Sequence, residues 1–275
     1  MTTQVYTCTT TGLPAIDAGG CKRLLAKLPP NAEWRAWMPR FTDAFPKVPR
    51  SQWKPIDRRS IFSWVLDQGE HGSCTDHGGC YAQRKTRVLQ GMTDVELSAT
   101  FAYALVNGGR DQGARDSDIL TIMQSKGRCL MSEFPESKIY ERQIPASAFQ
   151  TAERFKVTDA WKLADFDEIV SAIQYGFIPV FDLQVGDNFN DFDGDGAVGF
   201  SSGLGNHCVH GDGCWVTNAG RWLIDMQNSW GPTWGNQGRG GVAEEHVNSV
   251  DQDAYAIRVA LNDPQDPNQP PSATN

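Results

Sequence analysis

The chain has 275 residues, of which 40% are hydrophobic and nine are Trp, so it can fold around a substantial core. Its 33 acidic residues outnumber its 25 basic residues and give a net charge of −8, which argues against a protein that holds nucleic acid through the phosphate backbone. No apolar run approaches the roughly 18 residues of a membrane span, and no basic region followed by an apolar core opens the chain. We therefore expect a cytoplasmic or virion-associated protein with no membrane and no nucleic-acid partner.

The first 46 residues carry two recognisable features. A short helix is predicted at residues 20–28, and an aromatic cluster follows it, formed by Trp34, Trp37, Phe41 and Phe45. Cys8 and Cys21 also lie here and belong to a total of seven cysteines, an odd number. Without a visible secretory signal we expect mostly reduced thiols, although these two could be oxidised later in a particle released from cells.

A helix is predicted to begin at Cys74. Gly69 and Gly72 loosen the backbone before it, apolar residues follow at helical spacing, and Gly91 supplies a stop. The positive end of a helix dipole stabilises a thiolate, which is the form of cysteine that attacks carbonyl carbon. Cys74 is therefore a candidate nucleophile.

The chain from residue 61 to about 143 is predicted to be mainly helical. One helix covers residues 97–106, with a cap at Ser98, and another covers residues 116–126, before Gly127. A further helix at 165–175 opens with Asp165 and Glu168 in a capping-box arrangement.

Strands dominate the later part of the chain. They are predicted at residues 178–185, 207–216, 222–227, 240–243 and 254–261. Helices first and an antiparallel sheet later is an α+β order.

Two motifs in this strand-rich part complement Cys74. His207 lies on an apolar strand, and Asn228-Ser229-Trp230-Gly231-Pro232-Thr233-Trp234-Gly235 follows the next strand. Together with the upstream segment from Gln68 to Cys74, and in this order, they resemble the papain family of cysteine peptidases. His207 lies 133 and Asn228 154 residues after Cys74, close to the roughly 130–150 residues of papain-type enzymes.

The resemblance covers residues 47–262 and implies a papain-like α+β fold. A helical left half would span about 61–150 and an antiparallel sheet or barrel about 151–262, with the active-site cleft between them. Residues 263–275 are proline-rich and polar and are expected to be a disordered tail.

The resemblance also implies the site residues. Cys74 would be the nucleophile, His207 the general base and acid, and Asn228 the group that holds the imidazole. Gln68 would donate to the oxyanion. The predicted function is a cysteine endopeptidase that acts on proteins or peptides through a thiolate–imidazolium pair, without a metal or cofactor.

Three further residues are expected at the substrate cleft. Trp230 would shield the bond between His207 and Asn228 from water. Gly113 is either a turn glycine or a residue that hydrogen-bonds the substrate backbone. Cys208, next to the base, would line the S2 pocket.

The sequence departs from the family signature at two positions. His71 replaces a cysteine three residues before the nucleophile, which removes a disulfide typical of secreted members, and Thr75 replaces an aromatic residue. A Gly-Ser-Cys-Thr form is similar to bacterial and phage-type branches of the family.

The role of residues 1–46 is open. They could form an arm packed on the body or on an assembly partner, or an inhibitory segment laid through the cleft. A catalytically silent scaffold, such as a virion or assembly component, is the corresponding alternative for the whole chain.

Metal binding is the alternative from another class. Zinc-type ligands gather in two clusters, namely His71, Cys74, His77 and Cys80, and His207, Cys208, His210 and Cys214. Residues 191–196 match the first half of a calcium loop, but Ser202 stands at the twelfth position, so we expect an acidic turn there.

Overall fold

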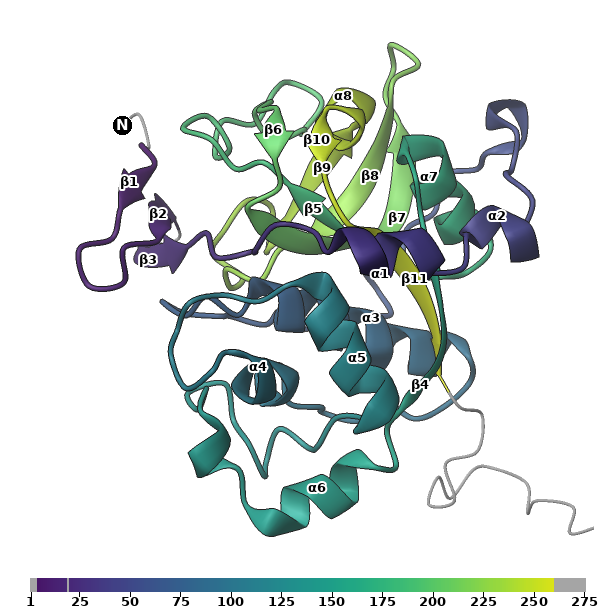
Figure 1. Ribbon diagram of the computed structural model, residues 1–275. Coiled ribbons are helices and arrows are strands. Elements are labelled where there is room, and N and C mark those ends of the chain that lie inside the picture. Colours follow the sequence, from purple (N-terminus) through teal and green to yellow (C-terminus); the bar gives the residue numbers. More distant parts are fainter. Residues whose placement is uncertain (1–3, 19, 260–275) are drawn as a thin grey trace, which may run out of the picture.

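The computed structural model describes residues 4–18 and 20–259, and in it helices and strands gather in two regions (Figure 1). Helices α3 to α6 fill the lower part of the view and most of the large sheet the upper part, while β4 and β11 extend down beside α5. The α+β class is confirmed. The predicted tail at 263–275 lies outside the described residues.

Helix α3 (Cys74–Leu89) is the central element of the helical part. It packs against α5 and also against β7 and β11 of the sheet, so nearly all of its residues are buried. Its polar side chains therefore need partners. Asp76 pairs with Arg128 at 2.6 Å and accepts the Tyr103 N–H at 2.8 Å, while Gln83 accepts from Arg128 at 3.1 Å.

Shorter helices surround α3. They are α4 (Phe101–Val106), α5 (Asp116–Ser125), the 3₁₀ turn η2 (Glu141–Gln143) and α6 (Ala146–Ala152). The prediction that α4 begins near Ser98 is wrong. Leu97 is bridged to Leu130 and the Ser98 N–H donates to the Cys129 carbonyl, so this stretch is extended and Thr100 precedes the helix.

The main sheet is antiparallel with the order β4-β11-β5-β7-β8-β9. Its strands are β4 (Val157–Lys162), β5 (Val180–Leu183), β7 (His207–Val216), β8 (Trp222–Gln227), β9 (Arg239–Ala243) and β11 (Ala254–Val259). The sequence did not predict β4. The predicted end of the last strand, residues 260 and 261, lies outside the described residues.

Two helices of the strand-rich part also contact the sheet. Helix α7 (Phe166–Gln174) packs on β7 and α8 (Glu244–Asn248) on β9. Asp165 caps α7 by accepting the Glu168 N–H at 2.8 Å, as predicted, but the Glu168 carboxylate accepts from Ala164 instead of closing the box. Strands β6 (Gly203–Leu204) and β10 (Val250–Asp251) form a separate parallel pair.

The N-terminal segment forms a small sheet of its own. It consists of β1 (Tyr6–Thr7), β2 (Pro14–Ala18) and β3 (Cys21–Leu24), with Ala18 opposite Cys21 and Ala15 opposite Leu24. The predicted helix at 20–28 is therefore wrong, because pairing with β2 keeps this stretch extended. From β3 the chain runs between the helical and sheet regions to α1 (Ala32–Trp37) (Figure 1).

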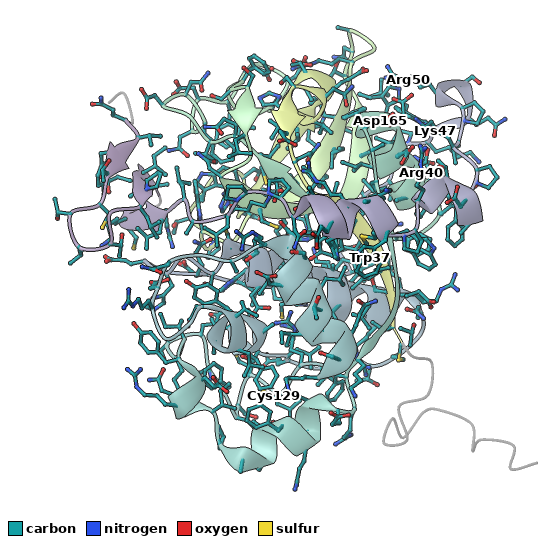
Figure 2. All side chains as sticks on the ribbon, viewed as in Figure 1. Trp37, Arg40, Lys47, Arg50, Cys129 and Asp165 are labelled. Atoms are coloured by element: carbon teal, nitrogen blue, oxygen red, sulfur yellow. The ribbon has the colours of Figure 1, made fainter. Side chains whose placement is uncertain are left out.

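Ion pairs and aromatic rings fasten the next segment to α7. It contains α2 (Phe41–Ala44) and the 3₁₀ turn η1 (Arg50–Gln52); Lys47 lies 2.8 Å from Asp165 and Arg50 lies 2.6 Å from Asp167. Lys47 and Asp165 are labelled close together in Figure 2. Phe41 and Phe45 stack, but Trp37 is 71% exposed and lies outside the predicted cluster.

All seven cysteines are free thiols. Among the described residues, no helix is long and apolar enough to cross a membrane.

Candidate active site

Cys74 is the first residue of α3, as predicted. Ser73 precedes it as the N-cap, and the Ser73 carbonyl accepts the N–H groups of Asp76 and His77 at 3.1 and 3.0 Å. Burial raises the pKa of the Cys74 thiol, and the nearby backbone of Cys208 in β7 opposes this effect. Because Cys208 directly follows His207, the sulfur lies against the strand that carries the candidate base.

The His207 ring is bonded to Asn228. Its Nε2 lies 2.8 Å from Asn228 Oδ1, an oxygen that also accepts the Ser229 N–H at 2.8 Å. This second bond fixes the amide oxygen toward the ring, so Nε2 carries the proton. His207 Nδ1 is buried and has no hydrogen-bond partner within the described chain.

Aromatic side chains enclose this pair. The Trp230 ring lies 4.8 Å from the His207 ring, and Phe189 packs at 5.5 Å against Trp230. His207, Asn228 and Trp230 are all inaccessible to solvent. Trp230 therefore occupies the position that shielding the His207–Asn228 bond requires.

Gln68 is held by the segment that carries Asn228. Its Oε1 accepts the Ser229 hydroxyl at 2.7 Å, and its backbone N–H donates to the Ser229 carbonyl at 2.9 Å. The Gln68 amide donates to the His71 carbonyl at 2.7 Å and reaches the Leu24 carbonyl at 3.4 Å. The sequence analysis did not identify Ser229 as a support for Gln68, although it directly follows Asn228.

A second contact missed from the sequence joins two loops. His71, which stands where the family has a cysteine, places Nδ1 3.2 Å from Asp111 Oδ2. Asp111 also accepts the Gly72 N–H at 2.9 Å and the Tyr103 hydroxyl at 2.5 Å. Burial raises the pKa of Asp111, but these three donors outweigh it and leave the pKa below its ordinary value. This contact links the nucleophile loop to the Gly113 loop.

Residues 24–28 lie across this site, and we call them the arm. Lys27 donates its N–H to the Asn206 carbonyl at 3.2 Å on the sheet side, and Leu28 donates to the Ala114 carbonyl at 2.9 Å on the helical side. At Gly113, where φ is +85°, an added Cβ would collide with the Ala26 carbonyl oxygen. Gly113 is therefore both a turn glycine and a place where extended backbone approaches closely.

The arm covers the nucleophile. The Cys74 side chain is fully buried, and burial raises its pKa to about 12. Burial likewise lowers the pKa of His207 to about 4, against the opposing effect of Asn228. In this covered form both groups are neutral at pH 7, which differs from the expected thiolate–imidazolium pair. The loss of solvation disfavours both charges more than the N-terminal end of α3 stabilises a thiolate.

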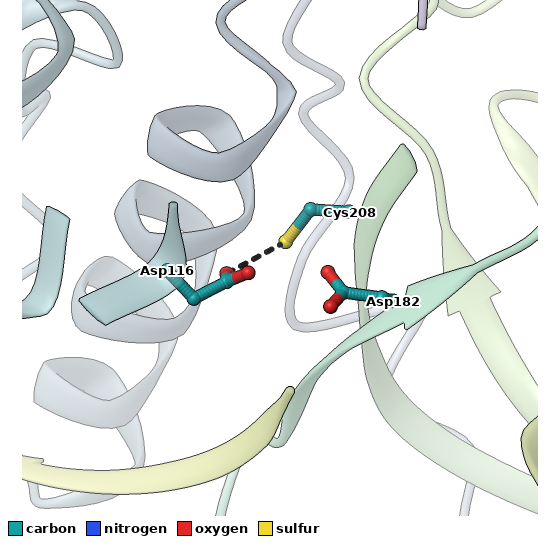
Figure 3. A group of neighbouring side chains, drawn as sticks. All are labelled: Asp116, Asp182 and Cys208. Atoms are coloured by element: carbon teal, nitrogen blue, oxygen red, sulfur yellow. Dashed lines mark hydrogen bonds between the residues drawn. The ribbon is translucent and has the colours of Figure 1, made fainter. Parts of the chain in front are cut away.

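An acidic pocket adjoins Cys74. Asp116 opens α5, Asp182 lies on β5 and Cys208 on β7, and one ligand atom from each lies within 4.8 Å of the others. The Cys208 thiol donates to Asp116 at 3.3 Å, and the three side chains point toward one another (Figure 3). Only Cys208 was expected in this region.

The two His/Cys clusters of the zinc-binding alternative do not assemble. Across residues 4–18 and 20–259, the acidic pocket is the only group of three or more His, Cys, Asp or Glu ligands that converges. His77 bonds the Ser73 carbonyl at 2.9 Å, and His210 lies 2.9 Å from the Lys85 ammonium. The 191–196 segment is a turn in which Asp193 accepts backbone N–H groups and pairs with Arg221, as expected for an acidic turn.

An open cavity lies away from Cys74 and His207. It measures about 760 Å³ and is lined by Arg59, Trp215, Asp225 and Arg239, among others. Cys74 and His207 do not line it.

No protein-family model and no curated protein matches the sequence. The chain is similar in structure to xylellain, a cysteine protease from Xylella fastidiosa, with a TM-score of 0.70, 19% identity and coverage of 85% of this chain and 95% of that one. It is also similar to digestive procathepsin L 3 of Tenebrio molitor larval midgut, with a TM-score of 0.62, 18% identity and coverage of 80% and 73%. Bromelain from Ananas comosus, in complex with the E64 inhibitor, gives a TM-score of 0.57, 17% identity and coverage of 77% and 99%. The fold is papain-like, as the motifs implied.

Proposed function

We propose that this chain is a cysteine endopeptidase of the papain type, in the branch with a Gly72-Ser73-Cys74-Thr75 nucleophile motif. One observation supports it above the others. The Cys74 thiol lies beside the backbone of Cys208, the residue after His207, and the His207 ring is bonded to Asn228 at 2.8 Å. These contacts support a nucleophile, a base and an orienting group that come from three separate segments.

The reaction follows from these positions. The Cys74 sulfur attacks a peptide carbonyl carbon, and the carbon–oxygen π electrons move to the oxygen. Gln68 and the Cys74 N–H donate to that oxygen, and one such donor is typically worth about 2.7–4 kcal/mol of barrier. His207 takes the Cys74 thiol proton at Nδ1 and gives it to the leaving amine as the tetrahedral intermediate collapses and its carbon–nitrogen bond breaks. It then takes a proton from the water that attacks the thioester and returns it to the Cys74 sulfur as the acid product leaves.

The arm must leave before a substrate can enter. It bonds both walls of the cleft and holds Cys74 and His207 in a dry, neutral state. These contacts favour the inhibitory interpretation of the N-terminal segment over an arm that packs elsewhere. The protein is then a latent peptidase in this form.

A catalytically silent scaffold is the second candidate. The observation that favours it is the complete burial of Cys74, whose pKa of about 12 leaves almost no thiolate at neutral pH.

Replacement of the nucleophile distinguishes the two candidates. We expect a peptide-library digest by the full chain carrying Lys27→Glu, a change that weakens the arm, to release products, and Cys74→Ala in that background to abolish them. Cys80→Ala is the matched control, because Cys80 is also buried on α3 and its thiol contacts only structural groups such as the Leu97 carbonyl. Undiminished turnover after Cys74→Ala would overturn the proposal.

A further inference from the structure

The acidic pocket beside the nucleophile is already occupied by a side chain of the arm. The Lys27 ammonium lies 2.7 Å from Asp182, 3.5 Å from Asp253 and 3.7 Å from Asp116. These four side chains are at most 1% exposed. The Lys27 side chain, buried as far as its ammonium group, therefore occupies the pocket formed by the three carboxylates.

The charge of the pocket requires a cation. Asp116, Asp182 and Asp253 supply three carboxylates, and apart from Lys27 their closest cation is Arg35, which lies 2.6 Å from Asp253. Burial raises the pKa of Asp116 and of Asp182, which face each other, and Lys27 opposes this in both. Burial alone would lower the pKa of Lys27, but the three carboxylates raise it above its ordinary value. Without an ammonium or guanidinium, the carboxylates would face one another in a dry site.

Apolar residues next to the carboxylates suit a long aliphatic stem. Ala114, which is bridged to Lys27, and Cys208, which bonds Asp116, belong with Val180 and Tyr255 to the apolar cluster that contains Cys74. Lysine and arginine place methylene groups on such a surface and carry the charge at the end. Leucine or methionine would fill the volume but leave the carboxylates unpaired.

The pocket lies where it can bind a side chain of the substrate. Asp116 comes two residues after Ala114, whose carbonyl accepts the Leu28 N–H of the arm, and the backbone of Cys208 lies beside the Cys74 thiol. A side chain in the pocket therefore belongs to a residue bound next to the attacked bond. Cys208, which we expected to line S2, bonds Asp116 (Figure 3).

We propose that Asp116, Asp182 and Asp253 form a specificity pocket for a basic side chain. The substrates are peptides with Lys or Arg as the second residue on the acyl side of the cleaved bond, and Lys27 occupies the pocket as an internal substitute. This inference rests on the proposed peptidase function for cleavage, but binding tests it separately.

The binding experiment uses the full chain with Cys74→Ala, which prevents turnover, and Lys27→Glu, which sets a fourth carboxylate against the three and releases the arm. Fluorescent hexapeptides that differ only in Lys, Arg, norleucine or Glu at one position are titrated by anisotropy. We expect Lys and Arg to bind about 10-fold or more tighter than norleucine, the order of one charge-assisted hydrogen bond, and Glu to bind weakest. Asp182→Asn should bring Lys close to norleucine.

Two variants control for the arm. Lys22→Glu makes the same change of charge on β3, where Lys22 pairs with Glu70 at the surface. The arm should therefore stay docked in this variant and block the binding of all the peptides. Lys27→Ala replaces Lys27→Glu if the latter does not fold. Equal affinity for Lys and norleucine in the released chain, or binding of neither, overturns the pocket.

The same released chain with Cys74 intact separates this proposal from the peptidase proposal. We expect its kcat/KM to be about 10-fold or more higher for Lys than for Leu at this position. Cleavage with Leu preferred contradicts the pocket alone. Selective binding of Lys without any cleavage contradicts the peptidase function alone.

Discussion

The Gln68 amide owes its direction to Ser229. The Ser229 hydroxyl donates to Gln68 Oε1 at 2.7 Å, so the amide nitrogen is turned the other way and donates to the His71 carbonyl at 2.7 Å. The longer contact with the Leu24 carbonyl, at 3.4 Å, indicates that this amide can also reach a carbonyl oxygen of a chain bound like the arm.

Gln68→Ala should therefore lower kcat by about 10²–10³ in the arm-released chain with little change in KM, since the donor acts on charge that develops in the transition state. Ser229→Ala should lower kcat less. In the Gln68→Ala background it should have almost no further effect, because the two residues act through one bond. Steady-state kinetics of the four chains checks this, and additive losses would contradict the positioning role.

His207 makes stability depend on pH. Its pKa is about 4 in the folded chain against an ordinary value of 6.5, so below pH 6.5 the unfolded chain binds more protons. The stability that neutral His207 contributes is present above pH 6.5 and is lost as the pH falls toward 4, by up to about 3 kcal/mol.

Urea denaturation at pH 7.5 and pH 4.5, each compared with His207→Gln, isolates this contribution. The difference between the two chains should shrink at the lower pH. A difference that does not change with pH would mean that the ring is not held neutral.

Helix α3 carries the nucleophile and depends on polar pairs inside the molecule. Asp76 is fully buried in the first turn of the helix and is held by Arg128 at 2.6 Å and by the Tyr103 N–H at 2.8 Å. Burial raises the pKa of Asp76, which Arg128 only partly offsets.

Asp76→Ala should destabilise the fold by about 3–5 kcal/mol, because it strands the Arg128 guanidinium without its carboxylate. Arg84→Ala is the matched control, since its partner Asp94 is partly exposed and the expected loss is about 1 kcal/mol or less. Chemical denaturation measures both. Equal decreases in the free energy of unfolding for the two variants would show that the buried pair contributes no more to stability than the partly exposed one.

The arm is the element that sequence reasoning interpreted least well. Residues 20–28 contain residue types that a short helix tolerates, but strand pairing with residues 15–18 and backbone bonds to both cleft walls keep them extended. The extended conformation thus depends on partners that lie far away in the sequence, and no local sequence pattern identifies those partners.

Across the whole molecule, the sequence predicted those parts that local signals encode. The helix at Cys74, the cap at Asp165 and the order of His207 and Asn228 were readable because capping residues, periodicity and spacing lie within short windows. The acidic pocket was not readable, since Lys27, Asp116, Asp182 and Asp253 come from four distant segments. The neutral state of Cys74 and His207 was equally hidden, because it follows from coverage by the arm.

The reactivity of the Cys74 thiol tests the central claim most directly. Iodoacetamide labelling of the full chain, read by mass spectrometry over a range of pH, compares the unchanged protein with Lys27→Glu and uses the exposed Cys21 as an internal reference. In the unchanged chain Cys74 should react far more slowly than Cys21, with a rate that rises about tenfold per pH unit, as a pKa of about 12 requires. In the released chain Cys74 should react faster than Cys21 and nearly independently of pH between about 6 and 8, as an ion pair with His207 predicts. Labelling of Cys74 no faster than Cys21 after release of the arm would contradict the account.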